Sequence, residues 1–535
     1  MSIPVNVPMW AAAVLPIVLL LVLMVKLNWP AAKAAPVALA VAVIVSLTLY
    51  RTDIVTVGLE SLKGVWSALV ILIVVWPAII IYEITNEAQA FDALKLGIRK
   101  MSPHELIQMM ALGWIFPSFL QGITGFGVAV AVGAPLLCGI GVKPLYSVII
   151  VLLGHSWGAT FGTLALAWQA LITQSGIGGG LVADTALWAG IFIWFYNFVG
   201  GFCLCWFYGR GKGLKEGLPA VLILSTIQGG GQLLLGQVNQ TLACFLPTCV
   251  ALVAVLLMGR TRRYGRAWQL AGSAIMDRSR TAQEESGETL GFNQAFLPYY
   301  VLTGVTLFCL LIGPVKAFLE QWQIGFAFPE RVTGYGYVTP AVESYSPLAP
   351  LTYPGTFLII SCVVGYVYFK ARGCIGPGGL GRILRRAVKK TVPSSVAVIG
   401  FIVTSKVMGC SGQVSVLAEG IVSVLGVGYA FFAPIVGLLG AFMTSSNMAS
   451  NILFAEFQMT TAELLGLSVP GILGAQTAGG AIGSAICPGN IVLGTSTTGQ
   501  TGEEGTVLGK VLPITVACAA ICGVALFICA VLLHV

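Results

Sequence analysis

Long, almost uncharged apolar segments recur along this chain and decide what it can fold into. About 20 apolar residues are enough for a helix to cross a lipid bilayer, and such runs follow one another between residues 8 and 533. Of the 535 residues, 57% are hydrophobic and only 9% are charged, whereas soluble domains carry about 25% charged residues. A soluble fold of this length could not bury so much apolar surface. The sequence therefore predicts an all-α polytopic membrane protein.

The first apolar run and the cysteines of the sequence lead to two further expectations. The first apolar run, residues 8–25, has no basic residue before it and no small-residue cleavage site, so it is expected to stay in the mature protein. Thirteen cysteines are scattered through the expected spans without a C-x-x-C pair, as buried cysteines acting as small hydrophobes would be. We expect no metal site, no bound cofactor and no nucleic-acid partner.

Basic side chains gather in two linkers, residues 259–295 and 370–390, and these set the expected topology. By the positive-inside rule both linkers are cytoplasmic. Two apolar spans separate them, so the segment 317–350, with Arg331 as its only basic residue, is expected outside.

One pattern of small polar residues occurs twice. An offset of 320 positions places Thr124 of I-T-G-F-G-V-A on Thr444 of M-T-S-S-N-M-A, and Gly154 on Gly474. Counting spans, the first copy begins outside and the second inside, so the repeat is inverted. Many secondary transporters are built this way, with the binding site near the membrane midplane where the repeats meet.

The predicted fold has about 12 transmembrane helices plus two re-entrant helical hairpins in two inverted-topology repeats. Basic residues flank the first hairpin on both sides (Arg99 and Lys100, then Lys143), so it should enter and leave on the cytoplasmic face. The glycine-rich segment 228–232 is interpreted as a connection between two short spans. The expected parts are N-terminal transmembrane helices (1–62), a first inverted repeat (63–210) with a hairpin at 104–139, connecting transmembrane helices (211–258), a cytoplasmic basic loop (259–295), peripheral transmembrane helices with an external loop at 317–350 and a cytoplasmic basic loop (296–390), and a second inverted repeat (391–535) with a hairpin at 429–458.

The polar clusters inside the two hairpins are interpreted as their tips. Irregular backbone at membrane depth is tolerated only where protein buries it or where it lines a cavity, because lipid cannot form hydrogen bonds with it. Close helix packing by small residues is the alternative, but matched positions in two repeats favour a binding site. The predicted substrate-binding residues are Gln121, Thr124, Gly125, Gly127, His155, Ser156, Thr444, Ser445, Ser446, Asn447, Asn451, Gln476 and Thr477.

Residues 154–158, G-H-S-W-G, match the G-x-S-x-G nucleophile elbow of hydrolases. A hydrolase would also need a strand before the serine and a separate histidine and acid. The chain has only His104, His155 and His534, of which the second lies inside the motif and the third is the penultimate residue. We interpret the glycines as a broken helix, whose N-terminal N–H groups suit an anion, and we do not expect an enzyme.

Ionisable residues inside expected spans are costly and are therefore functional candidates. Glu83 and Glu87 end the third span, and an interfacial position is their alternative. Lys406 lies in the corresponding part of the second copy, where snorkelling to the surface is the alternative. His155 titrates near neutral pH, and Glu456 follows the second tip. These five residues are the predicted proton-coupling candidates.

Several segments resemble the bacterial L-lactate permease family. They are F-L-Q-G-I-T-G-F-G, V-K-P-L-Y, T-S-S-N-M-A-S-N-I-L-F-A-E-F-Q, A-Q-T-A-G-G and C-P-G-N-I, in order along the chain. The resemblance implies a proton symporter that imports L-lactate, D-lactate and glycolate, without a tightly bound cofactor. Related hairpin carriers are often dimers, so a homodimer is expected by analogy. The expected partners are a small organic anion, protons and the lipid bilayer.

The chain departs from the family pattern at both tips. The resemblance implies acids at the positions of Gln121 and Asn447. We expect the coupling proton to move to His155, Glu83 or Glu87, or coupling to be absent. A sodium-coupled or sulfonate-type anion carrier of the same fold stays open, because hydroxyl and carbonyl oxygens also suit Na⁺.

Overall fold

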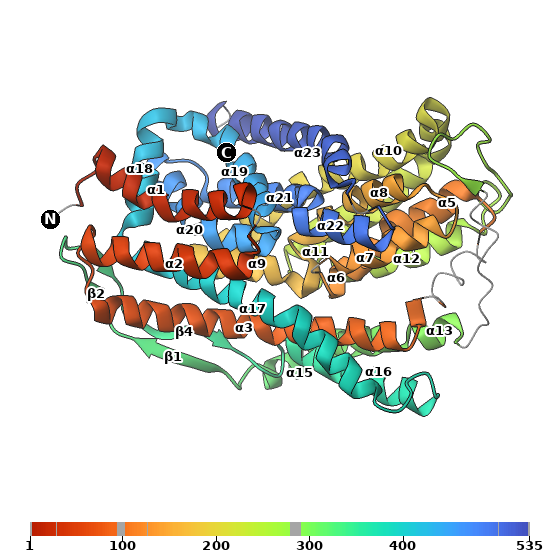
Figure 1. Ribbon diagram of the computed structural model, residues 1–535, viewed down its shortest axis with the longest axis horizontal. Coiled ribbons are helices and arrows are strands. Elements are labelled where there is room, and N and C mark those ends of the chain that lie inside the picture. The colour runs from red at the N-terminus through yellow and green to blue at the C-terminus, as the bar shows by residue number, and fades with distance from the viewer. Residues whose placement is uncertain are drawn as a thin grey trace.

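The computed structural model describes residues 3–27, 29–91, 93, 102–125, 127–278, 290–500 and 502–532, and its regular structure is almost entirely helical (Figure 1). Arg99, Lys100, Phe126 and His534, and the middle of the basic linker 259–295, fall outside these ranges.

Eight helices among the described residues are long and apolar enough to cross a membrane, or up to ten if each of two bent pairs counts as one span. A polytopic helical membrane protein is therefore confirmed, and the count of about twelve is not. Several apolar runs form helices too short to cross alone, namely α1 (Val7–Leu21), α7 (Val128–Cys138) and α12 (Phe245–Met258).

The long helices α3 (Ile54–Glu87) and α17 (Gly379–Ser411) pack side by side along most of their length. The indole Nε1 of Trp76 donates a hydrogen bond of 3.2 Å to the hydroxyl of Ser395 across this contact. In Figure 1 these two helices form the lower side of the molecule, next to α2 (Ala31–Thr48) and α16 (Pro354–Ala371).

Two helical pairs turn back inside the molecule rather than at its ends (Figure 1). In the first, α5 (Glu105–Met110), a π-helical turn and α6 (Phe116–Ile123) run inward, and α7 packs against them on the way back. In the second, α19 (Tyr429–Thr444) runs inward and α20 (Asn447–Leu465) returns along it. These pairs occupy the segments predicted as hairpins, and α20 extends past the predicted end at residue 458.

Each pair is followed by an interrupted helix. In the first copy α8 (Pro144–Ser156) and a short 3₁₀ turn precede α9 (Gly162–Ser175), and the two segments are bent by 52°. In the second, α21 (Val469–Gly483) and a 3₁₀ turn precede α22 (Pro488–Thr497). The G-H-S-W-G segment thus lies at the end of α8 and in its 3₁₀ turn, with no strand before it, so it is not a nucleophile elbow.

One connection was predicted wrongly. The glycine-rich segment 228–232 lies inside a helical run from α10 (Gly180–Ser225) through a π-helical turn to α11 (Gly231–Gly236). The extra residue of a π turn brings the glycines against the side chain of Trp194, which leaves no room for a Cβ at Gly229. The remaining helices are α13 (Phe292–Ala295), α14 (Leu297–Leu311), α15 (Gly313–Leu319), α18 (Gln413–Leu425) and α23 (Glu504–Phe527).

The all-α prediction missed four short strands in the expected external loop. They form two antiparallel pairs, with β1 (Ile324–Phe328) on β4 (Val342–Leu348) and β2 (Arg331–Val332) on β3 (Val338–Thr339).

An ion pair fastens this segment to the start of α3. Arg331 donates a 2.9 Å hydrogen bond to Asp53, whose side chain caps the helix by accepting from Thr56. The bond from the Thr56 hydroxyl and the Arg331 guanidinium lower the pKa of Asp53 to about 2. The ion pair is therefore intact throughout the physiological pH range.

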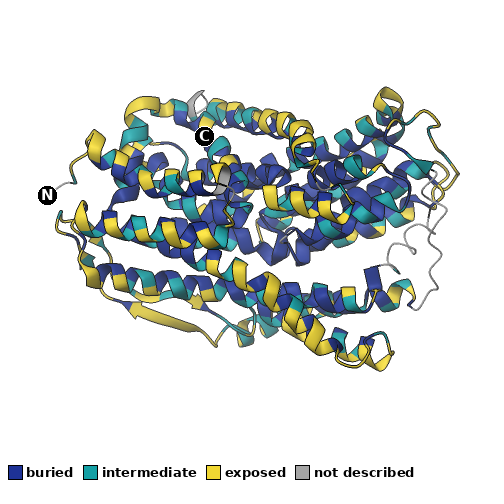
Figure 2. Ribbon diagram, in the orientation of Figure 1, coloured by how far each residue is buried: buried dark blue, intermediate teal, exposed yellow. Residues whose placement is uncertain are grey.

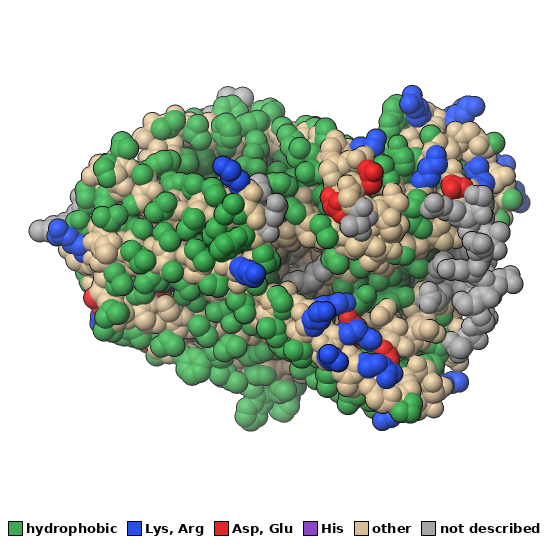
Figure 3. Space-filling model, in the orientation of Figure 1, with side chains coloured by type: hydrophobic (Ala, Val, Ile, Leu, Met, Phe, Trp, Pro, Cys, Tyr) green, Lys and Arg blue, Asp and Glu red, His purple; other side chains and the backbone are tan. Residues whose placement is uncertain are grey.

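Burial and charge are distributed unevenly. Figure 2 shows buried residues concentrated where α6, α9, α20 and α21 meet, in the middle of the molecule. Figure 3 shows Lys and Arg side chains mostly in the right half of the view, whereas the strands lie at the left in Figure 1. Both predicted cytoplasmic linkers thus lie opposite the predicted external loop.

We expect single cysteines to report this topology. In a cysteine-depleted background, a cysteine at Glu343, exposed on β4, should react with a membrane-impermeant maleimide added to whole cells. A cysteine at Arg372, exposed after α16, should react only after permeabilisation. The reverse labelling pattern would contradict the assignment of sides.

Candidate functional site

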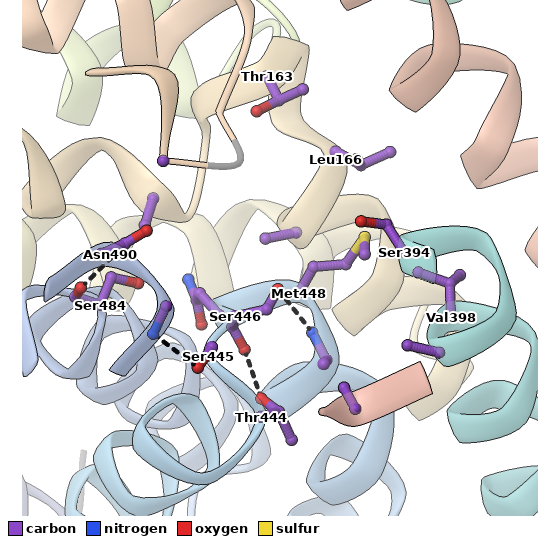
Figure 4. Close-up of a pocket in the computed structure, with 18 of the residues that line it drawn as sticks. Thr163, Leu166, Ser394, Val398, Thr444, Ser445, Ser446, Met448, Ser484 and Asn490 are labelled. Carbon is purple, nitrogen blue, oxygen red and sulfur yellow. Dashed lines mark hydrogen bonds between the residues drawn. The ribbon is translucent and has the colours of Figure 1, made fainter. Parts of the chain in front are cut away.

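A cavity of about 320 Å³ lies where the two hairpin tips meet. It is lined from the first hairpin by Gln121 and Gly127 and from the second by residues 444–449. Figure 4 shows Thr444, Ser446 and Met448 facing this space, with Thr163 and Leu166 of α9 on one side and Ser394 and Val398 of α17 on another. Figure 3 shows that this face of the molecule is hollowed near its centre.

Side-chain hydrogen bonds hold the second tip in shape. The hydroxyl of Ser446 accepts from the N–H of Ala449 and so caps α20. The hydroxyl of Thr444 lies 2.7 Å from the carbonyl oxygen of Gly440 and 3.0 Å from that of Ser446. Between these residues Ser445 adopts a positive φ of 56°, which makes the sharp turn. The polar cluster is thus required by the turn itself.

The second tip is joined to both interrupted helices. Ser445 accepts a 3.2 Å hydrogen bond from the N–H of Gly489 at the start of α22. The amide of Asn447 donates to the hydroxyl of Thr160, which also bonds to Thr477 of α21. Thr160 was not predicted, and its only sequence signal is its place directly after the G-H-S-W-G break.

Besides α9, four of the described helices begin at the cavity. The N-cap or first-turn residues of α2, α7, α20 and α22 all line it, the last through Gly489 and Asn490. The first-turn N–H groups of a helix have no partner within it, and the helix dipole places partial positive charge there. Among the described residues that line the cavity, none is Asp, Glu, Lys or Arg. The cavity can therefore hold an anion by N–H and hydroxyl donors without a fixed cation.

The backbone beside the cavity is strained. Three consecutive residues at the start of α9, Thr163, Leu164 and Ala165, have positive φ values of 49°, 53° and 66°. Left-handed backbone costs about 1–2 kcal/mol for each non-glycine residue. The hydroxyl of Thr163 lies so close to Gly125 that a Cβ there would be 2.1 Å away. Such strain is typical of binding sites and moving segments.

Seven of the thirteen predicted substrate-binding residues line the cavity, namely Gln121, Gly127, His155, Thr444, Ser445, Ser446 and Asn447. The other six, Thr124, Gly125, Ser156, Asn451, Gln476 and Thr477, do not. The Ser156 hydroxyl faces Tyr196 at 3.0 Å, and Asn451 donates to Thr477 at 2.9 Å. These residues form the framework behind the tips.

Several lining residues had no sequence signal. Pro30, Ala31 and Ala32 at the start of α2 reach the cavity. So do residues of α17, namely Pro393, Ser394, Ala397, Val398 and Phe401. They are apolar or small residues within apolar runs, so only the packing of distant helices brings them to the site.

The proton-coupling candidates fall in three separate places. His155 is buried and lines the cavity, with its Nδ1 2.6 Å from the carbonyl oxygen of Val151. A carbonyl accepts only, so Nδ1 carries the ring proton. Lys406 and Glu456 lie together, away from the lining residues.

Glu83 and Glu87 lie at the C-terminal end of α3 in ion pairs. Arg386 bonds to both carboxylates, at 2.6 and 2.5 Å, Lys390 bonds to Glu83 at 2.6 Å and Arg382 bonds to Glu87 at 2.7 Å. This position, with two cations on each carboxylate, is consistent with the interfacial alternative.

Comparison with known proteins agrees with this architecture. A family model described as L-lactate permease matches residues 10–533. The chain belongs to the L-lactate permease family. It is 26% identical over 502 residues to an L-lactate permease of Halalkalibacterium halodurans, covering 92% of this chain and 91% of that protein. Its identity to an Escherichia coli L-lactate permease is 26% over 519 residues, covering 92% and 90%.

One relative of this L-lactate permease family member is named for a different substrate, glycolate. Glycolate permease GlcA of Escherichia coli is 24% identical over 537 residues, covering 96% of this chain and 94% of that protein. The crystal structure of the YdaH transporter of Alcanivorax borkumensis is 14% identical, covering 86% and 84%, with a TM-score of 0.41. At that score the likeness supports no conclusion. Family membership and the apolar helices make this a multi-pass membrane protein of the bacterial cell membrane.

Gly480 tests the contact behind the second tip. A Cβ on Gly480 would lie 1.9 Å from Oδ1 of Asn447, so Gly480→Ala must displace the start of α20. Because overpacking costs about 1–3 kcal/mol, we expect a lower thermal unfolding temperature for the purified variant. Gly509→Ala in α23, where nothing lies within 4 Å, is the control and should not lose stability. Equal stability of both variants would contradict the tight contact.

Proposed function

We propose that the protein imports small monocarboxylates, L-lactate, D-lactate and glycolate, by proton symport. The observation that carries the proposal is the cavity at which helices α2, α7, α20 and α22 begin. None of the described residues that line it is Asp, Glu, Lys or Arg. The family and its relatives named L-lactate permease and glycolate permease support this substrate class. A homodimer remains a prediction by analogy.

The carboxylate has donors on every side of the proposed site. The N–H groups of Ala449 and Gly489 are bonded to Ser446 and Ser445. The other first-turn N–H groups of α20 and α22 and the amide groups of Gln121 and Asn447 would face the carboxylate. A hydrogen bond to a charged group contributes about 1.5–3 kcal/mol. The apolar lining residues Leu166, Val398 and Met448 suit the methyl group of lactate. We infer that the seven predicted residues that line the cavity contact substrate and that the other six position them.

Alternating access would come from the proposed inverted repeats. The two hairpins turn at the same depth from opposite ends of the molecule (Figure 1), and each is followed by an interrupted helix. In transporters of this construction one repeat rocks against the other around a fixed midplane site. The strained turn at the start of α9 would absorb part of that movement.

A sodium-coupled or other organic anion carrier is the second candidate, and one observation favours it. The amide oxygens of Asn447 and Asn451 are buried without a hydrogen-bond partner among the described residues. Oxygen atoms of this kind coordinate Na⁺ in transporters with broken helices.

One experiment separates the two candidates. Purified protein in liposomes should accumulate labelled L-lactate when only a pH gradient, acid outside, is imposed. A sodium gradient at equal pH should drive only equilibration. Accumulation with sodium alone would favour the second candidate, and absence of lactate and glycolate uptake with either gradient would refute the proposed substrate class.

Ser446 offers a test of anion binding that preserves the helix cap. Asn and Asp cap helices about as well as Ser, so Ser446→Asn and Ser446→Asp differ mainly in charge. At an effective dielectric constant of 20, unit charges about 4–8 Å apart repel by about 2–4 kcal/mol. We expect Ser446→Asp to weaken L-lactate uptake affinity at least about tenfold, since 1.4 kcal/mol is a factor of ten.

The controls for this test isolate charge and position. Ser446→Asn should retain most of the affinity, and Ser423→Asp, exposed on α18, should behave as wild type. Unchanged affinity in Ser446→Asp would place the carboxylate elsewhere.

A further inference from the structure

A second cluster of ionisable side chains lies outside the substrate cavity, between α3, α17, α20 and the external strands. Glu60 and Lys63 of α3 are both 4% exposed and form an ion pair of 2.5 Å. Lys406 of α17 and Glu456 of α20 interact electrostatically with each other and with Glu60. None of these residues lines the cavity. Glu60 and Lys63 are buried and Lys406 and Glu456 are partly buried, and ionisable side chains in such apolar surroundings are costly and mark a functional site.

The aromatic ring of Tyr345 closes the cluster on the side of the strands. It lies 5.8 Å from the ammonium groups of both Lys63 and Lys406, and its hydroxyl accepts from Ser67 of α3 at 3.1 Å. Phe328 of β1 stacks edge-on against Tyr345 and also faces Lys63. The external strands therefore cover the two lysines.

Glu456 differs from the acids of α3, which are paired with cations. Glu83, Glu87 and Glu60 form ion pairs of 2.7 Å or less, whereas no such ion pair within 4.0 Å is formed by Glu456 to any described residue. Its carboxylate rests against the backbone of α17, where a Cβ on Gly409 would lie 2.4 and 2.6 Å from the two oxygens. A carboxyl group without a fixed cation can exchange a proton at a lower cost than a paired one.

We propose that Glu456 carries the coupling proton, in a site separate from the substrate cavity and formed with Lys406, Glu60 and the bare backbone at Gly409. This inference rests on the proposed function. An O–H bond forms on the Glu456 carboxylate when it takes a proton from outside water, and the same bond breaks when the proton is released to the cytoplasmic side. No other co-reactant is needed.

The surroundings contain few competing groups. From α17 and α3, the ionisable residues facing Glu456 are Lys406, Cys410, Glu60 and Lys63, and from the external segment Tyr337 and Tyr345. Helices α9 and α21 carry no ionisable side chain. On α19, Tyr429 is bonded to Gln458, and Glu419 of α18 is exposed. The other acid of α20, Glu463, is also exposed.

Coupling follows from the helices that the two sites share. The first turn of α20 lines the cavity at Asn447, and Glu456 lies nine residues further along the same helix, about 13 Å at 1.5 Å per residue. Lys406 lies on α17, which lines the cavity through Phe401. Protonation changes the attraction between α20 and α17, and substrate contacts both helices. Two ligands that bias the same packing are thermodynamically coupled.

The test uses purified protein in liposomes with labelled L-lactate. Glu456→Gln mimics the protonated acid. It should abolish accumulation driven by a pH gradient while leaving exchange of internal for external lactate at the wild-type rate. Glu463→Gln, on the same helix but exposed, should accumulate lactate as wild type does.

Other results would overturn the inference. Wild-type accumulation by Glu456→Gln would exclude Glu456 as the proton carrier, and loss of exchange as well would make it a structural residue. Loss of accumulation in Glu463→Gln would show that removing any acid suffices. If the wild-type protein itself took up no lactate or glycolate, the proposed function would fail first and this inference with it.

Lys406→Gln provides a second, directional measurement. Removing a nearby positive charge favours the protonated carboxyl group. The midpoint of the pH dependence of lactate uptake should therefore move to higher pH. A shift to lower pH, or no shift, would exclude the electrostatic contact between Lys406 and the proton-carrying group.

Discussion

The structure depends on satisfying helix ends that lie deep inside an apolar protein. Each end leaves backbone groups without an intrahelical partner, and lipid cannot supply one. At the second tip, Ser446 caps α20, Ser445 accepts from the start of α22, and the Asn490 side chain donates to the carbonyl oxygen of Ser484. Hydroxyl and amide side chains perform this task without charge. The cavity consequently has donors on several sides and remains neutral.

Glycine residues allow each hairpin to pack closely against the interrupted helix that follows it. A Cβ on Gly437 would lie 2.0 Å from the carbonyl oxygen of Gln476, and one on Gly479 would lie 1.9 Å from that of Pro434. At such distances α19 and α21 touch backbone to backbone. The first copy shows the same device, since a Cβ on Gly162 would meet the carbonyl oxygen of Gln121 at 2.7 Å. Close packing of this kind lets a hairpin move with its neighbour as one body.

The charged side chains of α3, α17 and α20 form two separate groups. The C-terminal end of α3 carries glutamates paired with arginines and a lysine of α17, and the second group is the cluster around Lys406 and Glu456. The described residues that line the cavity include neither an acid nor a Lys or Arg. This separation matters for the neutral residues Gln121 and Asn447 at the two tips. Because neither carries a charge, the proposed anion and proton need not compete for one carboxylate.

The sequence by itself determined the membrane class, the two hairpin tips and the helix breaks, because apolar run length, basic linkers and polar residues at matched positions are local signals. Only the tertiary structure decided which of these residues face one space. Asn451 and Gln476 carry the same chemistry as Asn447, yet they point into the framework. Glu60 and Lys63 gave no signal that they lie beside Lys406, since more than 300 residues of the chain separate them from it. The sequence gives the type of each side chain. Its burial and its interaction partner depend on helix packing, which brings together segments that lie far apart in the sequence.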